Sequence, residues 1–191
     1  MDFFIYSGAV PGGPEPDPAL NEEHWSYMDR FADGMIARGP TLAADRTTWT
    51  GSVHVVDLPS AEAAHQFVER EPYNRAGLFD QHLVRRFDNL LGRTMWEFPG
   101  GSDDPRFMVI AHVPDNNASE HAFTVPLIDV TGPARGRLIV HGDLLTPDEG
   151  RPVGVALALQ APTRRAVEAF LGRLDEHLEV RIHDWEFGGR R

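Results

Sequence analysis

Two stretches of the chain, GPTLAADRTTWTGSVHVVDLPSAEAAHQFVER at residues 39–70 and GDLLTPDEGRPVGVALALQAPTRRAVEAFLGR at residues 142–173, align at a constant offset of 103 without a gap. Identical residues recur along this alignment: Gly39 with Gly142, Leu42 with Leu145, Asp45 with Asp148, Gly51 with Gly154, Pro59 with Pro162, Ala63 with Ala166, Phe67 with Phe170 and Arg70 with Arg173. A repeat of this length predicts that the chain contains one fold twice, as a tandem duplication.

Each copy carries the same predicted order of elements, a strand, a helix, two strands, a helix and a strand, which is the ferredoxin-like βαββαβ order. We expect a first unit over residues 1–99, a linker at 100–105 and a second unit over residues 106–191. Helices cover one face of such a sheet and leave the other bare. We therefore expect an α+β fold in which the two sheets pack face to face as an internal pseudo-dimer, a barrel of the dimeric α/β type, around a central cavity. This fold is compatible both with a chain that stays monomeric and with one that forms a further homodimer.

The first helix is predicted to begin at Asn21, a capping residue followed by two glutamates, and to end near Arg38. One face of that helix would carry His24, Met28, Phe31 and Met35. His24 is therefore expected on the buried side. The corresponding helix of the second unit, over residues 117–136, is interrupted by prolines and a glycine. The last strand of the first unit is predicted at residues 95–98.

Composition excludes several classes of function. The chain has 191 residues, 41% of them hydrophobic, and a net charge of −11, which disfavours binding to a phosphate backbone. It has no cysteine, which excludes thiolate chemistry, and all 18 basic residues are arginine, which excludes a lysine base. No apolar run is long enough to span a membrane, and the N-terminus lacks the basic region of a secretion signal, so we expect a cytoplasmic protein.

The two copies differ where chemistry could reside. The first carries His24 and the run Glu71-Pro72-Tyr73, and the second has no equivalent of either. A histidine can exchange a proton near neutral pH, and a carboxylate can fix its tautomer. His24 and Glu71 are therefore the predicted catalytic pair, at one site per chain. The alternative is a buried histidine bonded to a backbone carbonyl, with Glu71 at the surface.

Four further residues are predicted to bind substrate. Tyr73 could donate from its hydroxyl or only pack its ring. Ser52 and His54 alternate with Val53 and Val55 along a strand, and we expect them to line the cavity. Arg38 could bind an anionic group or could be a solvated arginine at a helix end.

The remaining sequence features indicate a function less strongly than the residues above. A loop at residues 8–19, rich in proline and glycine, could be a lid or a passive insertion. No histidine pair has the spacing of a metalloprotease helix, so no metal is expected. The sequence also lacks the glycine motif of dinucleotide sites and the serine elbow of hydrolases. We expect no cofactor.

The first copy resembles the YCII-related (YciI-like) family through His24-Trp25, Gly34 to Pro40, Pro59 to Ala64, Glu71-Pro72-Tyr73 and Ala76 to Phe79. The second copy looks like a divergent member through Gly136 to Gly142, Asp148 to Gly150 and Trp185 to Gly188. The resemblance implies α+β barrels of paired units. Most members have no assigned reaction, and the enzymatic precedent is dehydrochlorination of a chlorinated hydroxyhydroquinone by a His-Asp pair. Glu71 stands where the family usually has aspartate, which adds one methylene.

Three functions follow as hypotheses. The first is a cofactor-independent enzyme of lyase, isomerase or cyclase type, in which His24 transfers protons, Glu71 orients it, and a small molecule, aromatic in the simplest case, occupies the barrel cavity. The second is a non-catalytic ligand-binding or accessory module, in which His24 and Glu71 stay apart. The third is a monooxygenase-like barrel that uses no cofactor, which oxygen consumption would reveal.

Overall fold

The computed structural model describes residues 1–100, 102–114, 132–146, 150–172, 174 and 176–189. Its strands are β1 (Asp2–Ala9), β2 (Met35–Leu42), β3 (Trp49–Asp57), β4 (Phe79–Asn89), β5 (Arg106–His112), β6 (Leu138–Leu145), β7 (Pro152–Gln160) and β8 (Glu179–Trp185). Its α-helices are α1 (Pro18–Met28), α2 (Ala61–Arg70), α3 (Pro72–Arg75) and α4 (Arg164–Leu171). Short 3-10 helices are η1 (Asp29–Gly34), η2 (Met95–Glu97) and η3 (Gly132–Arg137). No helix in the described ranges is long and apolar enough to cross a membrane.

The strands form a closed barrel in the order β1-β3-β2-β8-β5-β7-β6-β4. Two four-stranded halves, β4-β1-β3-β2 and β8-β5-β7-β6, have equivalent strand orders, and every pairing between neighbours is antiparallel. The pairs β2–β8 and β4–β6 join the halves. The predicted α+β barrel is therefore confirmed. Closure leaves none of these strands at an unpaired sheet edge.

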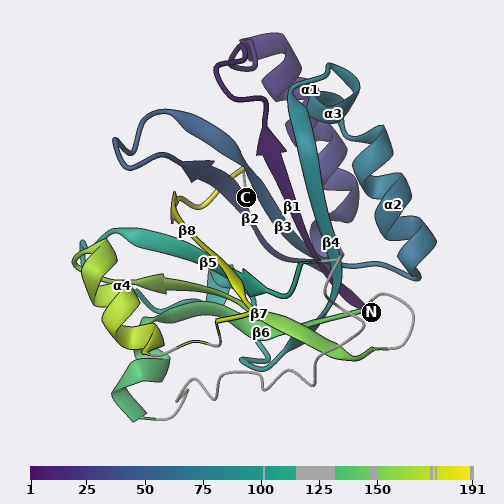
Figure 1. The fold of residues 1–191 in the computed structure, drawn as a ribbon. Helices are drawn as coiled ribbons and strands as arrows, with labels where there is room; N and C mark the ends of the chain where they lie inside the picture. The colour runs from purple at the N-terminus through teal and green to yellow at the C-terminus, as the bar shows by residue number, and fades with distance from the viewer. Residues whose placement is uncertain (101, 115–131, 147–149, 173, 175, 190–191) are drawn as a thin grey trace.

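Helices lie on the outside of the barrel, with α1, α2 and α3 on the first half and α4 on the second (Figure 1). Alternation along the strands separates inner from outer side chains. In β1, Phe4 and Tyr6 join the cluster inside the barrel, whereas Phe3 and Ile5 pack beneath the helices. Full burial of such a side chain contributes about 1.5–3 kcal/mol, so both layers stabilise the fold.

The structure repeats at the offset of the sequence. Strands β2 and β3 begin and end 103 residues before β6 and β7. The register shifts of β2 at Met35/Ala37 and Thr41/Leu42 recur in β6 at Leu138/Val140 and Leu144/Leu145. Tandem duplication as the origin of this match remains a prediction.

Two repeated glycines explain part of the sequence identity. A Cβ added at Gly39 would lie 1.9 Å from the carbonyl oxygen of Glu186, and one at Gly142 would lie 2.2 Å from that of Asp88. Both clashes occur where one half of the barrel meets the other. The close backbone approach at each seam therefore requires glycine.

The predicted helix from Asn21 to Arg38 was wrong at both ends. Asp17 is the cap, accepting a hydrogen bond from the Leu20 N–H at 2.8 Å, and Pro18 is the first helical residue. The α-helix ends at Met28, and residues 35–38 belong to β2, where pairing with β3 supplies their hydrogen bonds. Tertiary pairing has overridden the helical spacing.

Of two other predicted elements, one differs from the structure and one lies mostly outside the described residues. Residues 95–98 are not a strand, because Met95–Glu97 is a 3-10 helix whose start is closed by hydrogen bonds between Thr94 and Glu97. The predicted first helix of the second unit, over residues 117–136, lies mostly outside the described residues.

Candidate active site

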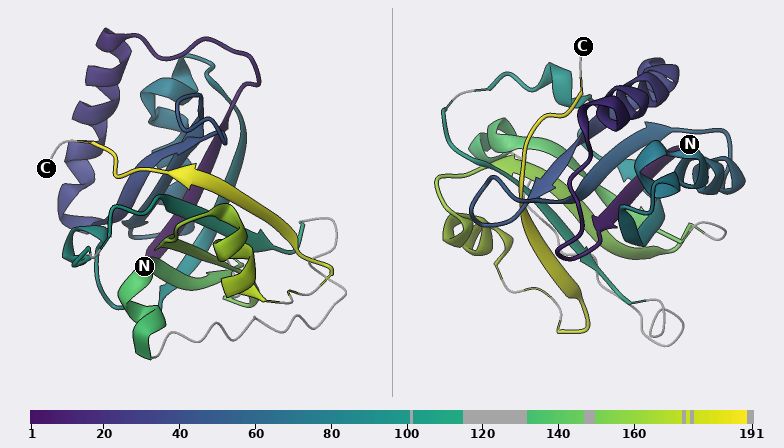
Figure 2. Two further views of the ribbon diagram at one scale, coloured as in Figure 1. Left: turned by 90° about the vertical axis from the view of Figure 1, so that its left-hand side faces the viewer. Right: turned by 90° about the horizontal axis from the view of Figure 1, so that it is seen from above.

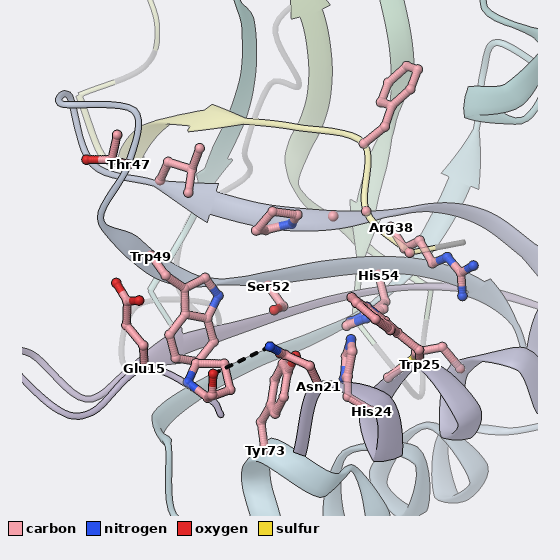
Figure 3. Close-up of a pocket in the computed structure, with 18 residues that line it drawn as sticks. Glu15, Asn21, His24, Trp25, Arg38, Thr47, Trp49, Ser52, His54 and Tyr73 are labelled. Carbon is pink, nitrogen blue, oxygen red and sulfur yellow. Dashed lines mark hydrogen bonds between the residues drawn. The ribbon is translucent and has the colours of Figure 1, made fainter. Parts of the chain in front are cut away.

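A cavity of about 400 Å³ lies between helices α1 and α3 and the outer face of strands β2 and β3. Its walls are formed by Glu15, Pro16, Asn21, His24, Trp25, Met28, Arg38, Gly39, Pro40, Leu42, Thr47, Trp49, Ser52, His54, Tyr73, Phe187, Gly188 and Gly189. Figure 3 shows His24, Asn21 and Tyr73 pointing from the helices toward the strand that carries Ser52 and His54.

The predicted position of this cavity between the two sheets was wrong. Val53 and Val55 point into the barrel, where they join a packed apolar cluster. Ser52 and His54 therefore point outward, toward the helices. Apolar side chains from both halves pack closely in the barrel interior.

His24 and Glu71 form a buried pair. The distance from His24 Nδ1 to Glu71 Oε1 is 2.5 Å, and the two residues are 9% and 3% exposed. The second carboxylate oxygen of Glu71 accepts the Asn74 N–H at 2.8 Å and so caps α3. This cap fixes the carboxylate because one oxygen is held by the backbone while the other faces the imidazole. The alternative that left Glu71 at the surface was wrong.

Tyr73 both packs and hydrogen-bonds. Its ring stacks on His24, with centroids 4.1 Å apart and an angle of 7° between planes. Its hydroxyl donates to Asn21 Oδ1. Burial, followed by the negative charge of Glu71, raises the pKa of the Tyr73 hydroxyl. The hydroxyl therefore stays protonated, and the stacking restricts rotation of the His24 ring.

His54 lies between the two sides of the site. Its ring centroid is 5.8 Å from that of His24 and 5.5 Å from that of Phe67. Burial is the main cause that lowers its pKa well below the ordinary value, with further lowering by His24 and Arg38. His54 is therefore uncharged at neutral pH. Ser52, two residues earlier, is buried on the same face.

Arg38 is not a solvated residue at a helix end, as one alternative held. It lies within β2, paired with His54 of β3, and is 5% exposed. Its Nη1 is 3.8 Å from a carboxylate oxygen of Asp29. Five of the six predicted site residues thus line one cavity, and the sixth, Glu71, lies behind His24.

Several wall residues were not predicted. Asn21 is one helical turn before His24, a spacing that could have identified it. Glu15 and Pro16 come from the predicted loop at residues 8–19, which does reach the site; its motion as a lid remains a prediction. Trp49, at the start of β3, packs against Tyr73 at 5.6 Å between centroids.

The second half contributes residues 187–189 to the wall. The Gly188 N–H donates to the Arg38 carbonyl oxygen at 3.0 Å, which lays this segment along β2. Figure 2 shows the segment after β8 running to the side of the barrel that carries α1. Nothing local in the sequence of residues 187–189 could have indicated this contact, because it depends on barrel closure.

The equivalent place in the second half is apolar. Val155 and Leu157 stand where the first half has Ser52 and His54, and both join a packed cluster with Leu91. The Leu90 N–H donates to the His141 carbonyl oxygen at 3.0 Å, as Gly188 does to Arg38. The backbone arrangement is thus repeated, whereas the polar side chains are not.

No group of three or more metal-ligating side chains occurs within the described ranges. No curated protein matches the chain.

Solved structures give three likenesses. The chain is 30% identical to 5-chloro-2-hydroxyhydroquinone dehydrochlorinase from Burkholderia phenoliruptrix AC1100, solved in complex with 2,5-dihydroxybenzoquinone; the match covers 47% of this chain and 95% of that chain, with a TM-score of 0.40. A chlorite dismutase candidate is 9% identical over 97% of this chain and 94% of that chain, with a TM-score of 0.52, which indicates the fold alone. A candidate monooxygenase from Lactobacillus acidophilus NCFM is 8% identical over 97% of this chain and 92% of that chain, with a TM-score of 0.44; because both the identity and the TM-score are low, this likeness supports no argument.

A model of the YCII-related domain matches residues 1–88. These residues include the predicted catalytic and substrate-binding side chains, and they coincide with the first half of the barrel through most of β4. Together with the solved relative that is 30% identical over 95% of its own length, this match shows that the chain belongs to the YCII-related family.

Proposed function

We propose that this protein is an enzyme that acts on a small molecule by proton transfer, in an elimination or isomerisation, with His24 as general acid and base. The observation that carries the proposal is the buried contact of 2.5 Å between His24 and Glu71, at the wall of a cavity of about 400 Å³. Both catalytic groups come from the protein, so the proposed step uses no cofactor.

The pair fixes which nitrogen reacts. A carboxylate oxygen can only accept a hydrogen bond, so His24 Nδ1 carries the proton that faces Glu71. In the neutral imidazole, Nε2 then has the free lone pair and can take a proton from the substrate. The electron pair left on the substrate forms a double bond and expels the leaving group, or the proton returns to another atom. Glu71 stabilises the imidazolium formed in between.

Aromatic side chains favour a planar substrate. Trp25, Trp49 and Tyr73 line the cavity, and such rings stack on flat molecules. We propose that Tyr73, Ser52 and His54 contact polar atoms of the substrate. The bound 2,5-dihydroxybenzoquinone of the dehydrochlorinase supports this substrate class.

We also propose that each half of the barrel is a ferredoxin-like unit, 1–99 and 106–191 with a linker at 100–105, and that the chain arose by tandem duplication. The equivalent strand orders and the recurring offset of 103 support this origin. The second unit would then act as a built-in partner. One working site per chain follows, because the apolar cluster of the second half has replaced the polar residues.

Chloride release from 5-chloro-2-hydroxyhydroquinone tests the proposed reaction. We expect turnover by the wild-type protein and a loss of about 10²-fold or more in His24→Gln, because general base catalysis supplies a factor of this size. His65→Gln is the matched control, since His65 is an exposed histidine on α2.

Equal chloride release by the wild type and His24→Gln would contradict the proposal. Tight binding of the compound without any release would favour a non-catalytic binding module instead. Consumption of oxygen that depends on the protein would favour the monooxygenase-like alternative.

A further inference from the structure

We propose that His54 is a second reactive group of this site, whose imidazole N–H donates a hydrogen bond to the substrate oxygen that becomes negative when His24 removes a proton. This inference rests on the proposed function, because it adds a group to the same reaction. One of its two tests measures binding alone and can be read without turnover.

The His54 ring is buried at the cavity, and its nitrogens are not used by the fold. The residue is 3% exposed and lines the cavity wall. Within the part of the chain that the structure describes, its ring contacts the rings of His24 and Phe67, and neither nitrogen makes a hydrogen bond. Buried polar groups in proteins are normally paired. A polar atom of a bound substrate can satisfy this ring.

His54 lies close to the histidine that takes the proton. Figure 3 shows the two rings approaching from opposite sides, His24 from α1 and His54 from β3, and their centroids are 5.8 Å apart. In a planar conjugated molecule, the atom that loses a proton and the oxygen that receives the charge lie within a few bonds of each other. One substrate can therefore give its proton to His24 and place that oxygen against His54.

The surroundings of the two rings give them different roles. Burial, followed by the positive charges of His24 and Arg38, lowers the pKa of His54 well below its ordinary value. His54 is thus uncharged and a weak base, whereas the Glu71 carboxylate stabilises the charged form of His24. His24 therefore takes the proton, and its new charge keeps His54 neutral. A neutral imidazole still has one N–H to donate.

The proposed step moves one proton and one electron pair. Nε2 of His24 takes the proton, and the electron pair of the broken bond passes through the conjugated system onto the substrate oxygen. The hydrogen bond from His54 strengthens as this oxygen becomes negative, and His54 keeps its hydrogen. When the pair returns, it expels the leaving group or takes a proton back from His24. A donor aimed at a developing charge stabilises the transition state more than the bound substrate.

The strand holds the His54 donor in a fixed place. His54 lies within β3, where it pairs with Ile5 of β1 on one side and with Arg38 of β2 on the other. The edge contact with Phe67, at 5.5 Å between centroids, packs against the ring. A donor fixed in this way needs little reorganisation during the reaction.

The second half of the barrel shows which side chain packing alone selects at this position. Leu157, 103 residues after His54, is fully buried in an apolar cluster. A leucine is sufficient for packing there, so the barrel does not require an imidazole. The histidine occurs in the half that also carries His24 and Glu71, which supports a role in the site.

The rate of chloride release from 5-chloro-2-hydroxyhydroquinone tests the donor through three substitutions. His54→Leu copies the second half and removes the N–H. We expect its kcat to fall by about 10²- to 10³-fold with a much smaller change in KM, as when one donor to a developing oxyanion is removed. His65→Gln, at an exposed histidine on α2, is the matched control and should keep the wild-type kcat.

His54→Asn and His54→Gln each keep one neutral N–H donor, near the place of Nδ1 and of Nε2 respectively. We expect one of them to be about tenfold or more faster than His54→Leu, the value of a hydrogen bond to a charged group, and it identifies the nitrogen that donates. A His54→Leu variant as fast as the wild type would contradict the proposal, as would two amide variants no faster than His54→Leu.

Binding of 4-nitrophenol tests the same donor without turnover, because its absorbance distinguishes phenol from phenolate. The measurement compares His24→Gln, in which this base cannot take the phenol proton, with the double variant His24→Gln/His54→Leu. The ratio of phenolate affinity to phenol affinity should be about tenfold or more higher in His24→Gln. Urea unfolding checks that both proteins are folded.

Equal ratios in the two folded proteins, or no binding at millimolar concentration, would contradict the role of His54. A wild type that releases no chloride, together with the expected difference in ratio, would overturn the proposed function and leave His54 as a donor to an anionic oxygen. The two failures are therefore distinguishable.

Discussion

At the scale of a single residue, Glu71 has a role both in the fold, as the cap of α3, and in the site, as the partner of His24. One of its oxygens caps α3 through the Asn74 N–H, and the other contacts His24 Nδ1. Its position between the last residue of α2 and Pro72 follows from the sequence, because proline disfavours helix in the residue before it. The extra methylene relative to the aspartate that the resemblance implied is accommodated here, since both contacts are made at hydrogen-bond distance.

Residue types and spacing predicted five of the side chains that line the cavity, but they did not predict where the cavity lies. Alternation separated Ser52 and His54 from Val53 and Val55, yet alternation alone does not say which pair points inward. The structure puts the valines inside the barrel because apolar side chains of both halves meet there. The contacts that residues 187–189 make at the cavity wall depend on barrel closure, and no local sequence pattern predicts them.

Buried and half-buried histidines should make the protein sensitive to mild acid. Burial lowers the pKa of His141 and of His183 from 6.5 to about 4, and it lowers that of His54 as well. Between pH 6.5 and 4 the unfolded chain binds protons on these rings that the folded chain does not. The free energy of unfolding should therefore be highest above pH 6.5 and fall as the pH decreases toward 4.

Urea unfolding at a series of pH values measures this slope. His141→Gln should flatten it, because a shift of the size given for His141 corresponds to on the order of 2–3 kcal/mol. His65→Gln, on the surface, should leave the slope as in the wild type. A free energy of unfolding that stays constant from pH 6.5 to 4 is the contrary outcome.

At the scale of elements, local sequence signals account for α2 better than for the start of β2. Ser60 caps α2 by accepting the Ala63 N–H at 3.1 Å, and the helix ends before Glu71 because Pro72 disfavours helix in the residue before it. The predicted helix extended too far, over residues 29–38, because the apolar spacing of these residues also fits a helix. Residues 35–38 instead pair with β3, and a local pattern could not show this pairing.

The two seams between the halves give a prediction about elements. Gly39→Ala at the β2–β8 seam and Gly142→Ala at the β4–β6 seam should each lower the free energy of unfolding by about 1–3 kcal/mol, because the added methyl meets a backbone carbonyl. Urea unfolding measures both.

Gly136→Ala is the matched control, since a methyl group added there would meet no atom of the described residues within 4 Å apart from its own chain neighbours. Its effect should stay within about 0.5 kcal/mol. If all three variants were equally stable, the seams would not require glycine.

At the scale of the whole molecule, the second half completes the site of the first. Arg46, in the turn between β2 and β3, pairs with Glu186 at 2.8 Å and with Asp184 at 3.3 Å, and Arg106 pairs with Glu186 at 2.7 Å. These contacts hold the segment that leads to residues 187–189 against β2. The repeat predicted the barrel because a second sheet was needed to cover the first. It did not predict that this sheet also supplies a wall of the cavity.

Exchange of ring hydrogens for deuterium tests the central claim, proton transfer by His24, independently of any leaving group. The probe is 2,5-dihydroxybenzoquinone in D₂O, followed by proton NMR with wild type, His24→Gln, Glu71→Gln and the control His65→Gln. We expect the wild type and His65→Gln to accelerate the exchange, Glu71→Gln to do so weakly, and His24→Gln to lose about 10²-fold or more of the acceleration. A wild-type protein that leaves the exchange rate unchanged, or a His24→Gln variant that matches it, would contradict this account.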